Sequence, residues 1–278
     1  MYLEKKRIGG VDEMKCQAVV DLIEKLAPKR LAEKWDNPGL LVGSPLQEVG
    51  KVYVCLDVSL PAAEEAIAAG ADMMVAHHPM IFNGLRHVRT DLYDGKLLQL
   101  LLSHNVAVYA AHTNLDIAQG GVNDVLAAAV GLERVEGFAV TDEASGACIG
   151  RIGYLPEKMP LGEFARQVKG RLGAECVRVV QGNDRQVQKV ALCSGAGADF
   201  IGKAAFKGAD VYLTGDVKYH DAQKAVQQGI NVIDAGHFAT EFPVVKVLAD
   251  YLRQESRGMK KPLEVVTDTV SRDYFTHL

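Results

Sequence analysis

Residues 73–79, Met-Met-Val-Ala-His-His-Pro, decide the fold, because an apolar run here ends abruptly in two histidines and a proline. Such a run is typical of a buried strand in an α/β protein, whose sheets bind ligands at the carboxyl ends of their strands. Neighbouring side chains of an extended chain point to opposite sides, so His77 and His78 are placed to hold two different metal ions. The alternative is one core histidine beside one surface histidine.

Two further strands are predicted around this stretch. Residues 51–57 alternate between polar and apolar side chains, and residues 106–111 form another apolar run. Helical patterns lie between the strands, so their order predicts parallel pairing with right-handed crossovers. If residues 112–116 stay extended, His112 and Asp116 share a face and reach the same sheet edge as the paired histidines.

The order of predicted elements divides the chain into four parts. Residues 1–13 are polar and form an N-terminal extension, and a first α/β lobe covers residues 14–130. A second α/β lobe covers residues 185–278, and a smaller strand–helix–strand piece, residues 131–184, connects the two lobes. Within this piece, residues 133–147 are polar with short breaks, which predicts a connecting segment.

The composition of the chain narrows its possible functions. Of 278 residues, 48% are hydrophobic and 24% are charged, as in ordinary globular proteins. The net charge of −4 argues against non-specific nucleic-acid binding, which needs a basic surface. Five scattered cysteines without a Cys-x-x-Cys pair favour reduced thiols over disulfides or a zinc ribbon. The N-terminus lacks a signal-peptide pattern and no apolar run reaches about 18 residues, so we expect a cytoplasmic protein without a membrane partner.

A second group of metal-binding residue types follows the predicted strand 231–234. His237 and Glu241 are four residues apart, so a helix that begins here projects both side chains from one face. Pro243 requires these residues to lie at the very start of that helix. The alternative interpretation is a glutamate that the helix dipole favours near a helix start.

Strand ends and the helix start together offer three histidines and two carboxylates, namely His77, His78, Asp116, His237 and Glu241. Nitrogen and oxygen ligands without thiolates suit Zn, Mn, Fe, Co or Ni better than Ca or Mg. Five protein ligands are more than one catalytic metal normally takes, and they fit two divalent ions that share a carboxylate. Such a pair activates water for hydrolysis. We therefore expect two α/β lobes with largely parallel sheets around a central dinuclear metal cleft.

The motifs around these residues carry a family resemblance. They are Trp35–Asn37, Gly39–Gly43, His77–Pro79, Ala111–Asp116, Thr214–Asp216 with His220, and Gly236–Glu241. Together they resemble the GTP cyclohydrolase 1 type 2 homologues, also called the NGG-one-interacting-factor-three-like family, over nearly the whole chain from Met14. The resemblance implies that the five residues above bind a dinuclear metal centre, with Glu241 bridging. It also implies a ring-shaped homohexamer whose metal sites face an internal cavity. Some members carry an inserted domain, for which this chain is too short.

The predicted directions of the strands give a pairing of these ligands. His78 and Asp116 come from neighbouring strands of the first lobe, and we assign them to one ion. His77 faces the other way and joins His237 from the second lobe on the other ion, while Glu241 reaches both. The second ion depends on how the lobes dock, so we expect it to bind more weakly.

The expected function is a metal-dependent hydrolase of a nucleotide-like or phosphorylated small molecule, with GTP cyclohydrolase chemistry and phosphoester hydrolysis both open. His112 and His220 are candidate catalytic residues that orient a ligand or carry a proton, against the alternative of buried, hydrogen-bonded histidines. The competing hypothesis is a non-catalytic metal-binding ring that regulates or binds a partner. A ring that docks DNA is a third hypothesis, which the net negative charge disfavours.

Overall fold

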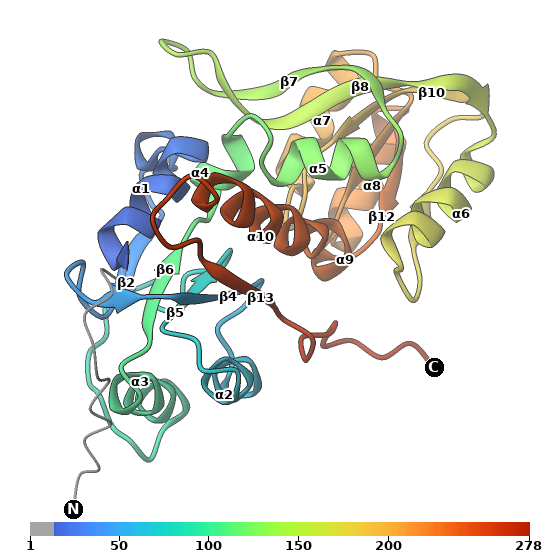
Figure 1. Cartoon of the computed structure of the whole chain (residues 1–278). Helices are drawn as coiled ribbons and strands as arrows, with labels where there is room; N and C mark the ends of the chain where they lie inside the picture. The colour runs from blue at the N-terminus through green and yellow to red at the C-terminus, as the bar shows by residue number, and fades with distance from the viewer. Residues whose placement is uncertain (1–13) are drawn as a thin grey trace, which may run out of the picture.

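The structure is a computed structural model that describes residues 14–278, and the predicted extension, residues 1–13, lies outside the described residues. Two sheets, one of five strands and one of six, form its framework, and helices cover them (Figure 1). The predicted α/β class is confirmed. A short antiparallel pair, β1 Met14–Lys15 and β3 Glu48–Val49, is separate from both large sheets.

The five-stranded sheet is mostly parallel. In spatial order its strands are β13 Glu264–Thr267, β4 Lys51–Cys55, β5 Met73–Ala76, β6 Ala107–Ala110 and β2 Gly39–Val42. β13, β4, β5 and β6 run parallel, whereas β2 is antiparallel to β6. All four residues of β5 are buried, as the apolar run before His77 predicts. The predicted parallel pairing of the strands around this run is confirmed.

Helices cover both faces of this sheet. They are α1 Cys16–Leu26 and α10 Pro243–Ser256 on one face, and α2 Leu60–Ala68 and α3 Tyr93–Ser103 on the other. The side chain of Ser59 caps α2 by accepting a hydrogen bond from the backbone N–H of Ala62 at 3.2 Å. Because α10 comes from near the end of the chain, the first sheet is complete only with C-terminal residues.

The six-stranded sheet is mixed. Its strands, in spatial order, are β7 Glu133–Asp142, β8 Ala147–Met159, β10 Val187–Leu192, β11 Val211–Thr214, β12 Asn231–Asp234 and β9 Arg178–Val180. The three central strands β10, β11 and β12 are parallel, and β7, β8 and β9 pair antiparallel with their neighbours. The expectation of largely parallel sheets therefore holds for the first sheet but not for the second.

The second sheet is also covered on both faces. The covering helices are α5 Val122–Ala129 and α6 Leu161–Leu172 on one face, and α7 Ile201–Phe206 and α8 Tyr219–Gln227 on the other. Two five-residue helices, α4 Thr113–Ile117 and α9 His237–Glu241, follow β6 and β12. Short 3-10 turns lie at Lys29–Leu31 and Ala198–Phe200. Within residues 14–278, no helix is long and apolar enough to cross a membrane.

The sheets do not follow the predicted division of the chain. Residues 131–184 do not stand between two lobes, because they supply β7, β8 and β9 to the second sheet. After the last central strand of the second sheet, the chain crosses back to the first sheet, where α10 packs on one face and β13 pairs with β4. Residues 133–147, predicted as a connecting segment, are mostly the strand β7. The strand lacks a clear alternation because it lies at the sheet edge, where only Phe138 and Ala139 are buried.

Candidate metal centre

His77 and His78 follow β5, and the neighbouring parallel strands fix both rings. His77 donates from Nδ1 to the carbonyl of Ala111 after β6, at 2.8 Å. His78 donates from Nδ1 to Oδ1 of Asp57 after β4, also at 2.8 Å. With Nδ1 as the donor, Nε2 is the atom of each ring that carries the lone pair once the ring is neutral, which is how proteins prepare histidines to bind metals. The rings do not point to opposite sides as predicted, because their centroids are only 4.9 Å apart.

The second sheet supplies His237 and Glu241 from α9, where they lie four residues apart on one face as predicted. Nδ1 of His237 donates to Oδ2 of Asp216 at 2.8 Å, so Nε2 is again the atom that can bind a metal once the ring is neutral. Pro243 is in the first turn of α10, directly after α9, which confirms the constraint inferred from the sequence. Glu241 is 4% exposed, so its carboxylate lies inside the protein.

Asp116 reaches the centre from α4, and the prediction that residues 112–116 stay extended is wrong. The N–H groups of both Leu115 and Asp116 donate to the carbonyl of His112, which closes a helical turn. The turn is stabilised by Asp36, whose carboxylate accepts hydrogen bonds from the backbone N–H and the hydroxyl of Thr113. Asp116 thus lies in the first turn of α4, and His112 is the residue that precedes this helix.

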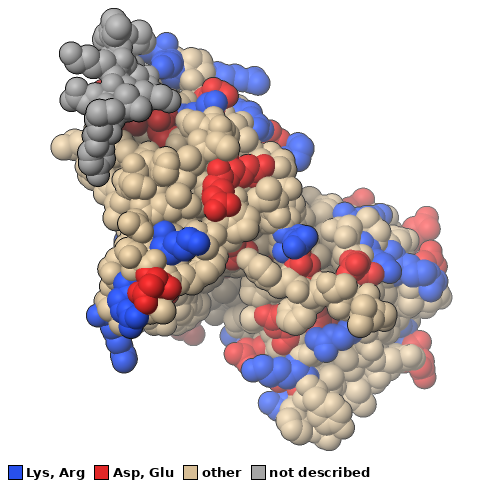
Figure 2. Space-filling view, turned by 90° about the horizontal axis from the view of Figure 1, so that it is seen from below, with Lys and Arg blue, Asp and Glu red and all other residues tan. Residues whose placement is uncertain are grey.

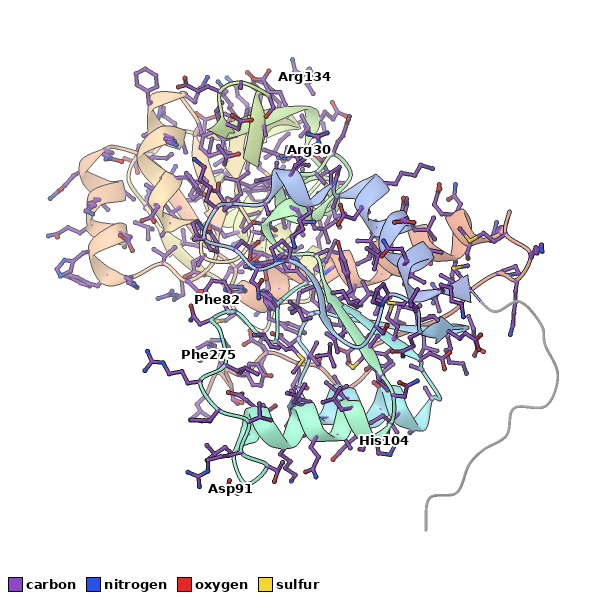
Figure 3. The ribbon with its side chains drawn as sticks, turned by 90° about the vertical axis from the view of Figure 1, so that its left-hand side faces the viewer. Arg30, Phe82, Asp91, His104, Arg134 and Phe275 are labelled. Atoms are coloured by element: carbon purple, nitrogen blue, oxygen red, sulfur yellow. The ribbon has the colours of Figure 1, made fainter. Side chains whose placement is uncertain are left out.

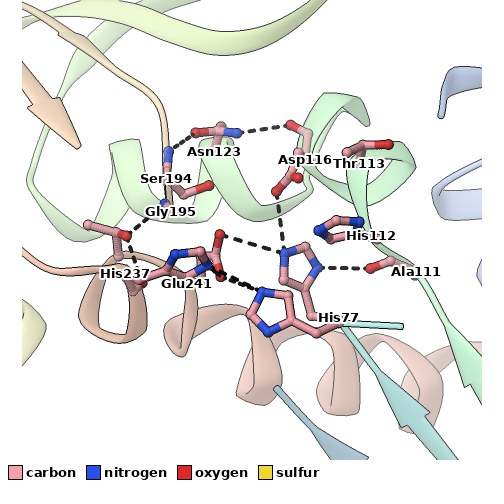
Figure 4. Close-up of polar contacts among 12 residues, drawn as sticks. His77, Ala111, His112, Thr113, Asp116, Asn123, Ser194, Gly195, His237 and Glu241 are labelled. Carbon is pink, nitrogen blue, oxygen red and sulfur yellow. Dashed lines mark hydrogen bonds and ion pairs between the residues drawn. The ribbon is translucent and has the colours of Figure 1, made fainter. Parts of the chain in front are cut away.

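The five predicted ligands meet in one cluster (Figure 4). Among the residues that the structure describes, two groups of three that could hold a metal ion consist only of these ligands, and a third group joins His112 to His77 and His78. His77, Asp116 and Glu241 form what we call the buried subsite, with Nε2 of His77 3.6 Å from Oδ1 of Asp116 and 3.9 Å from Oε1 of Glu241. His78, His237 and Glu241 form the open subsite, where the two Nε2 atoms lie 2.9 and 3.0 Å from Oε2 of Glu241. Glu241 is common to both, as a bridging carboxylate requires.

This grouping exchanges two of the predicted partners. The sequence assigned His78 with Asp116 and His77 with His237, whereas the structure groups His77 with Asp116 and His78 with His237. The reason is that His77 turns toward the β6 side, where Ala111 accepts its Nδ1 proton and α4 begins. The two subsites also differ in access, because the side chain of His77 is 1% exposed and that of His237 is 37% exposed.

Buried polar atoms of the cluster lack hydrogen-bond partners. Among residues 14–278 they include Nε2 of His77, Oδ1 of Asp116 and Oε2 of Glu241, together with Oγ of Ser194 nearby. The nitrogen and oxygen atoms of the cluster come close together here, but these atoms have no partner with the geometry of a hydrogen bond. Unpaired buried polar atoms are unfavourable, and a cation satisfies them. The residues present therefore fit a divalent metal.

The charges of the cluster shift the pKa values of its members. Burial opposes protonation of His78 and His237, yet the neighbouring carboxylates outweigh it and raise the pKa of His78 to about 10 and that of His237 to about 9. Burial works against the ionised form of Glu241, but the adjacent histidines hold the pKa of this carboxyl well below its usual range. Burial also raises the pKa of Asp116, although His77 offsets part of the effect.

The two candidate catalytic histidines lie in different places. His112 is at the edge of the cluster, with ring centroids 5.3 Å from His77 and 5.6 Å from His78, and its Nδ1 is held by Asp36 at 2.7 Å. His220 is exposed on α8, where its side chain contacts Gln223 and Tyr219. The structure brings His112 to the centre but does not bring His220 there, so the role of His220 stays a prediction.

Sequence reasoning missed the residues that orient the ligands. Asp57 and Asp216 hold the rings of His78 and His237, and each follows a parallel strand by two residues. A search for acids directly after parallel strands finds both of them. Gly195 lies in a Gly-rich stretch, residues 194–199, which is typical of a tight turn and does not by itself indicate contact with a metal ligand. Its φ of +59° and its contact with Glu241 become visible only once the second sheet is folded.

A cavity of about 550 Å³ reaches the open subsite, where His78 and His237 contribute to its wall. Asp57, Asp216 and Arg178 line it from the two sheets, and Phe238, Tyr274 and Phe275 add aromatic surface. The cavity is large enough for a small molecule.

Two exposed aromatic rings lie near His112. The ring centroids of Trp35 and Phe82 are each 6.2 Å from that of His112, and Phe82 is on the loop between β5 and α3 (Figure 3).

The fold and this cluster define an α/β protein with a candidate metal centre between two sheets. The chain belongs to the Duf34/NIF3 (NGG1p interacting factor 3) family, whose model matches residues 14–273. A relative from Clostridium perfringens, named GTP cyclohydrolase 1 type 2 homolog, is 31% identical over 94% of this chain and 99% of its own length. The resemblance seen in the sequence motifs is thereby confirmed.

Solved structures have the same fold. A Bacillus cereus protein related to NIF3 is 28% identical and superposes with a TM-score of 0.91 over 96% of this chain and all of its own. Reduced HcgD from Methanocaldococcus jannaschii is 33% identical, with a TM-score of 0.78 over 93% of this chain and 99% of that one. The two-sheet architecture is therefore that of experimentally determined relatives.

Proposed function

We propose that this protein is a dinuclear metal-dependent hydrolase of a nucleotide-like or phosphorylated small molecule. The observation that carries the proposal is the shared preparation of three histidines. Each donates its Nδ1 proton to an oxygen, and each keeps its Nε2 within 4 Å of the buried carboxylate of Glu241. The names of the relatives as GTP cyclohydrolase 1 type 2 homologs support the hydrolytic class.

The residues of the chain have distinct tasks in this proposal. His77 and Asp116 would hold one ion, His78 and His237 would hold the other, and Glu241 would be the ligand common to both. The ions, of Zn, Mn, Fe, Co or Ni, would lower the pKa of water and polarise the bond that is cleaved. His112 is oriented by Asp36, which leaves its Nε2 to exchange a proton with the substrate. The cavity beside His78 and His237 admits the substrate to the open subsite.

A substrate screen tests the hydrolase directly. Metal-loaded protein is offered GTP, cyclic nucleotides, dinucleotides and general phosphoesters, and we expect metal-dependent turnover of at least one class. A His112→Gln variant is expected to lose about 10²–10⁴-fold in kcat with its metal content unchanged, because general acid–base catalysis contributes that much. Full metal binding without turnover of any compound would favour the competing function, a non-catalytic ring that regulates or binds a partner.

Metal binding is expected to release protons at pH 7.5. The raised pKa values of His78, about 10, and His237, about 9, mean that both rings are protonated in the metal-free protein. Metal binding at the open subsite must displace those protons, so we expect release of about two per chain, and an apparent affinity that increases as pH rises toward 9. Calorimetric titration in buffers of different ionisation enthalpy measures the number. Binding without proton release would contradict these protonation states.

Self-association is part of the proposal. We infer a homohexamer, with the family resemblance as its basis, and several large apolar side chains exposed in the single chain support an interface. Phe206 is 90% exposed and Tyr219 is 79% exposed. Light scattering measures the assembly, and a monomer at micromolar concentration would contradict it.

The free thiols support a cytoplasmic location. Interspersed acidic and basic side chains on the face in Figure 2 do not favour nucleic acid as a partner.

A further inference from the structure

A single buried amide joins the two parts of the candidate metal centre. Asn123, on α5, is 0% exposed and uses its whole side chain in hydrogen bonds. Its Nδ2 donates to the backbone carbonyl of Asp116 at 3.2 Å and to that of Ile149 at 2.6 Å. Its Oδ1 accepts from the backbone N–H of Ser194 at 2.8 Å (Figure 4). Because donors and acceptor are all matched, the orientation of the amide is fixed.

The segments that Asn123 connects carry the two carboxylates of the buried subsite. Asp116 is itself one of them. Ser194 precedes Gly195, whose N–H donates to the hydroxyl of Thr240 at 3.0 Å, and Gly195 packs directly against the carboxylate of Glu241. One side chain therefore relates the position of α4, next to the first sheet, to that of the loop and helix that bear Glu241.

Arg151 holds the same short helix from the second sheet. It lies in β8, is 6% exposed, and donates to the carbonyls of Ile117 and Ala118 at 3.2 and 3.0 Å. These carbonyls end the helix that bears Asp116. Asp124 pairs with Arg151 and accepts a bond from Gly120 in the loop after α4. Helix α4 is too short to keep its place alone, so these contacts define where Asp116 lies.

We infer that Asn123, assisted by Arg151, is a positioning residue for the buried subsite: it sets the separation between Asp116 and Glu241 and thereby the affinity of that subsite for metal. The inference rests on the proposed metal pair, but not on hydrolysis. Asn123 bonds directly to the backbone of Asp116, which belongs to the buried subsite alone. It reaches Glu241, which both subsites share, only through Ser194 and Gly195. Loss of the amide is therefore expected to weaken the buried subsite more than the open one, which a general loss of stability does not do.

The test compares Asn123→Ala with Asn231→Ala in the full chain. Asn231 is also 0% exposed and also uses both ends of its amide, to Gly182, Asn183 and Asp210 in the second sheet. Metal-free protein is titrated with Zn²⁺ in competition with a chromophoric chelator. We expect Asn123→Ala to lose about 10–100-fold in affinity at one subsite, the range found when an outer partner is removed. Asn231→Ala is expected to melt earlier but to bind Zn²⁺ like the wild type.

Double variants identify the affected subsite. Adding His77→Ala to Asn123→Ala is expected to leave the retained Zn²⁺ in place, whereas adding His237→Ala removes it. Arg151→Lys keeps the charge but loses the Nη2 group that donates to both carbonyls at the end of α4. This variant is expected to weaken the same subsite and replaces Asn123→Ala in the test if that variant does not fold. Wild-type affinity at both subsites in Asn123→Ala, equal weakening in Asn231→Ala, or loss confined to the open subsite would each overturn the inference. A wild type that binds no Zn²⁺ would instead refute the proposed metal centre, and the inference with it.

Discussion

Glu241→Gln is expected to bind neither ion and to show no hydrolysis. The carboxylate of Glu241 lies within 4 Å of Nε2 of all three histidines, and it belongs to both subsites. The amide has nearly the same shape but no charge, so each ion loses the one anionic ligand that they share. The affinity is expected to fall by more than the ~100-fold that removal of an outer hydrogen-bond partner causes. Elemental analysis after gel filtration measures the loss.

Glu264→Gln is the matched control for this experiment. Glu264 is an exposed glutamate that pairs with Lys51 at the edge of the first sheet. Exposed ion pairs contribute only about 0–1 kcal/mol, so this variant is expected to keep both its metal and its stability. If Glu241→Gln retained two ions, the bridging role would be wrong. Retention of a single ion would mean that Glu241 belongs to one subsite.

Gly195→Ala is expected to empty the centre although Gly195 has no side chain to bind a metal. An added Cβ would overlap Oε1 of Glu241 and lie 3.1 Å from Nε2 of His237, so the carboxylate must move away. The backbone is also left-handed here, with φ at +59°, which is unfavourable by roughly 1–2 kcal/mol for an L side chain. We expect at least about 100-fold weaker metal binding together with a lower melting temperature.

Gly229→Ala separates the two effects. Gly229 has φ at +67°, but nothing lies within 4 Å of a Cβ added there. The backbone strain is therefore similar while the steric conflict is absent. This variant is expected to lose a comparable amount of stability and to bind metal like the wild type. Equal metal affinity in Gly195→Ala and Gly229→Ala would show that Glu241 is not held against Gly195.

Much of the centre was accessible from the sequence because its ligands follow a simple rule of α/β proteins. His77 ends an apolar run, and His237 with Glu241 follows another predicted strand, so the carboxyl ends of strands identified them. The partners within each subsite were not accessible. They depend on where each ring turns, and Ala111 and Asp57 decide this from other strands. Local sequence carries no record of such long-range contacts.

The errors in the fold have a similar origin. Residues 112–116 form a helical turn because Asp36, far away in the sequence, accepts hydrogen bonds from Thr113. The strand β7 escaped notice because an edge strand is recognised by its hydrogen bonds rather than by buried side chains. The return of β13 to pair with β4 follows from sheet completion, which a local pattern does not reveal.

That return has a consequence for the order in which the chain matures during synthesis. While the ribosome has released only the first half, one face of the first sheet still lacks Val244, Leu248 and Leu252 from α10. The edge of β4 is unpaired until β13 emerges. His77 and His78 are therefore synthesised before the first sheet is complete and before Glu241 is present. In the proposed metal centre neither subsite is complete before Glu241 has been synthesised. We therefore expect metal binding only late in synthesis, and weaker metal binding by a prematurely terminated chain.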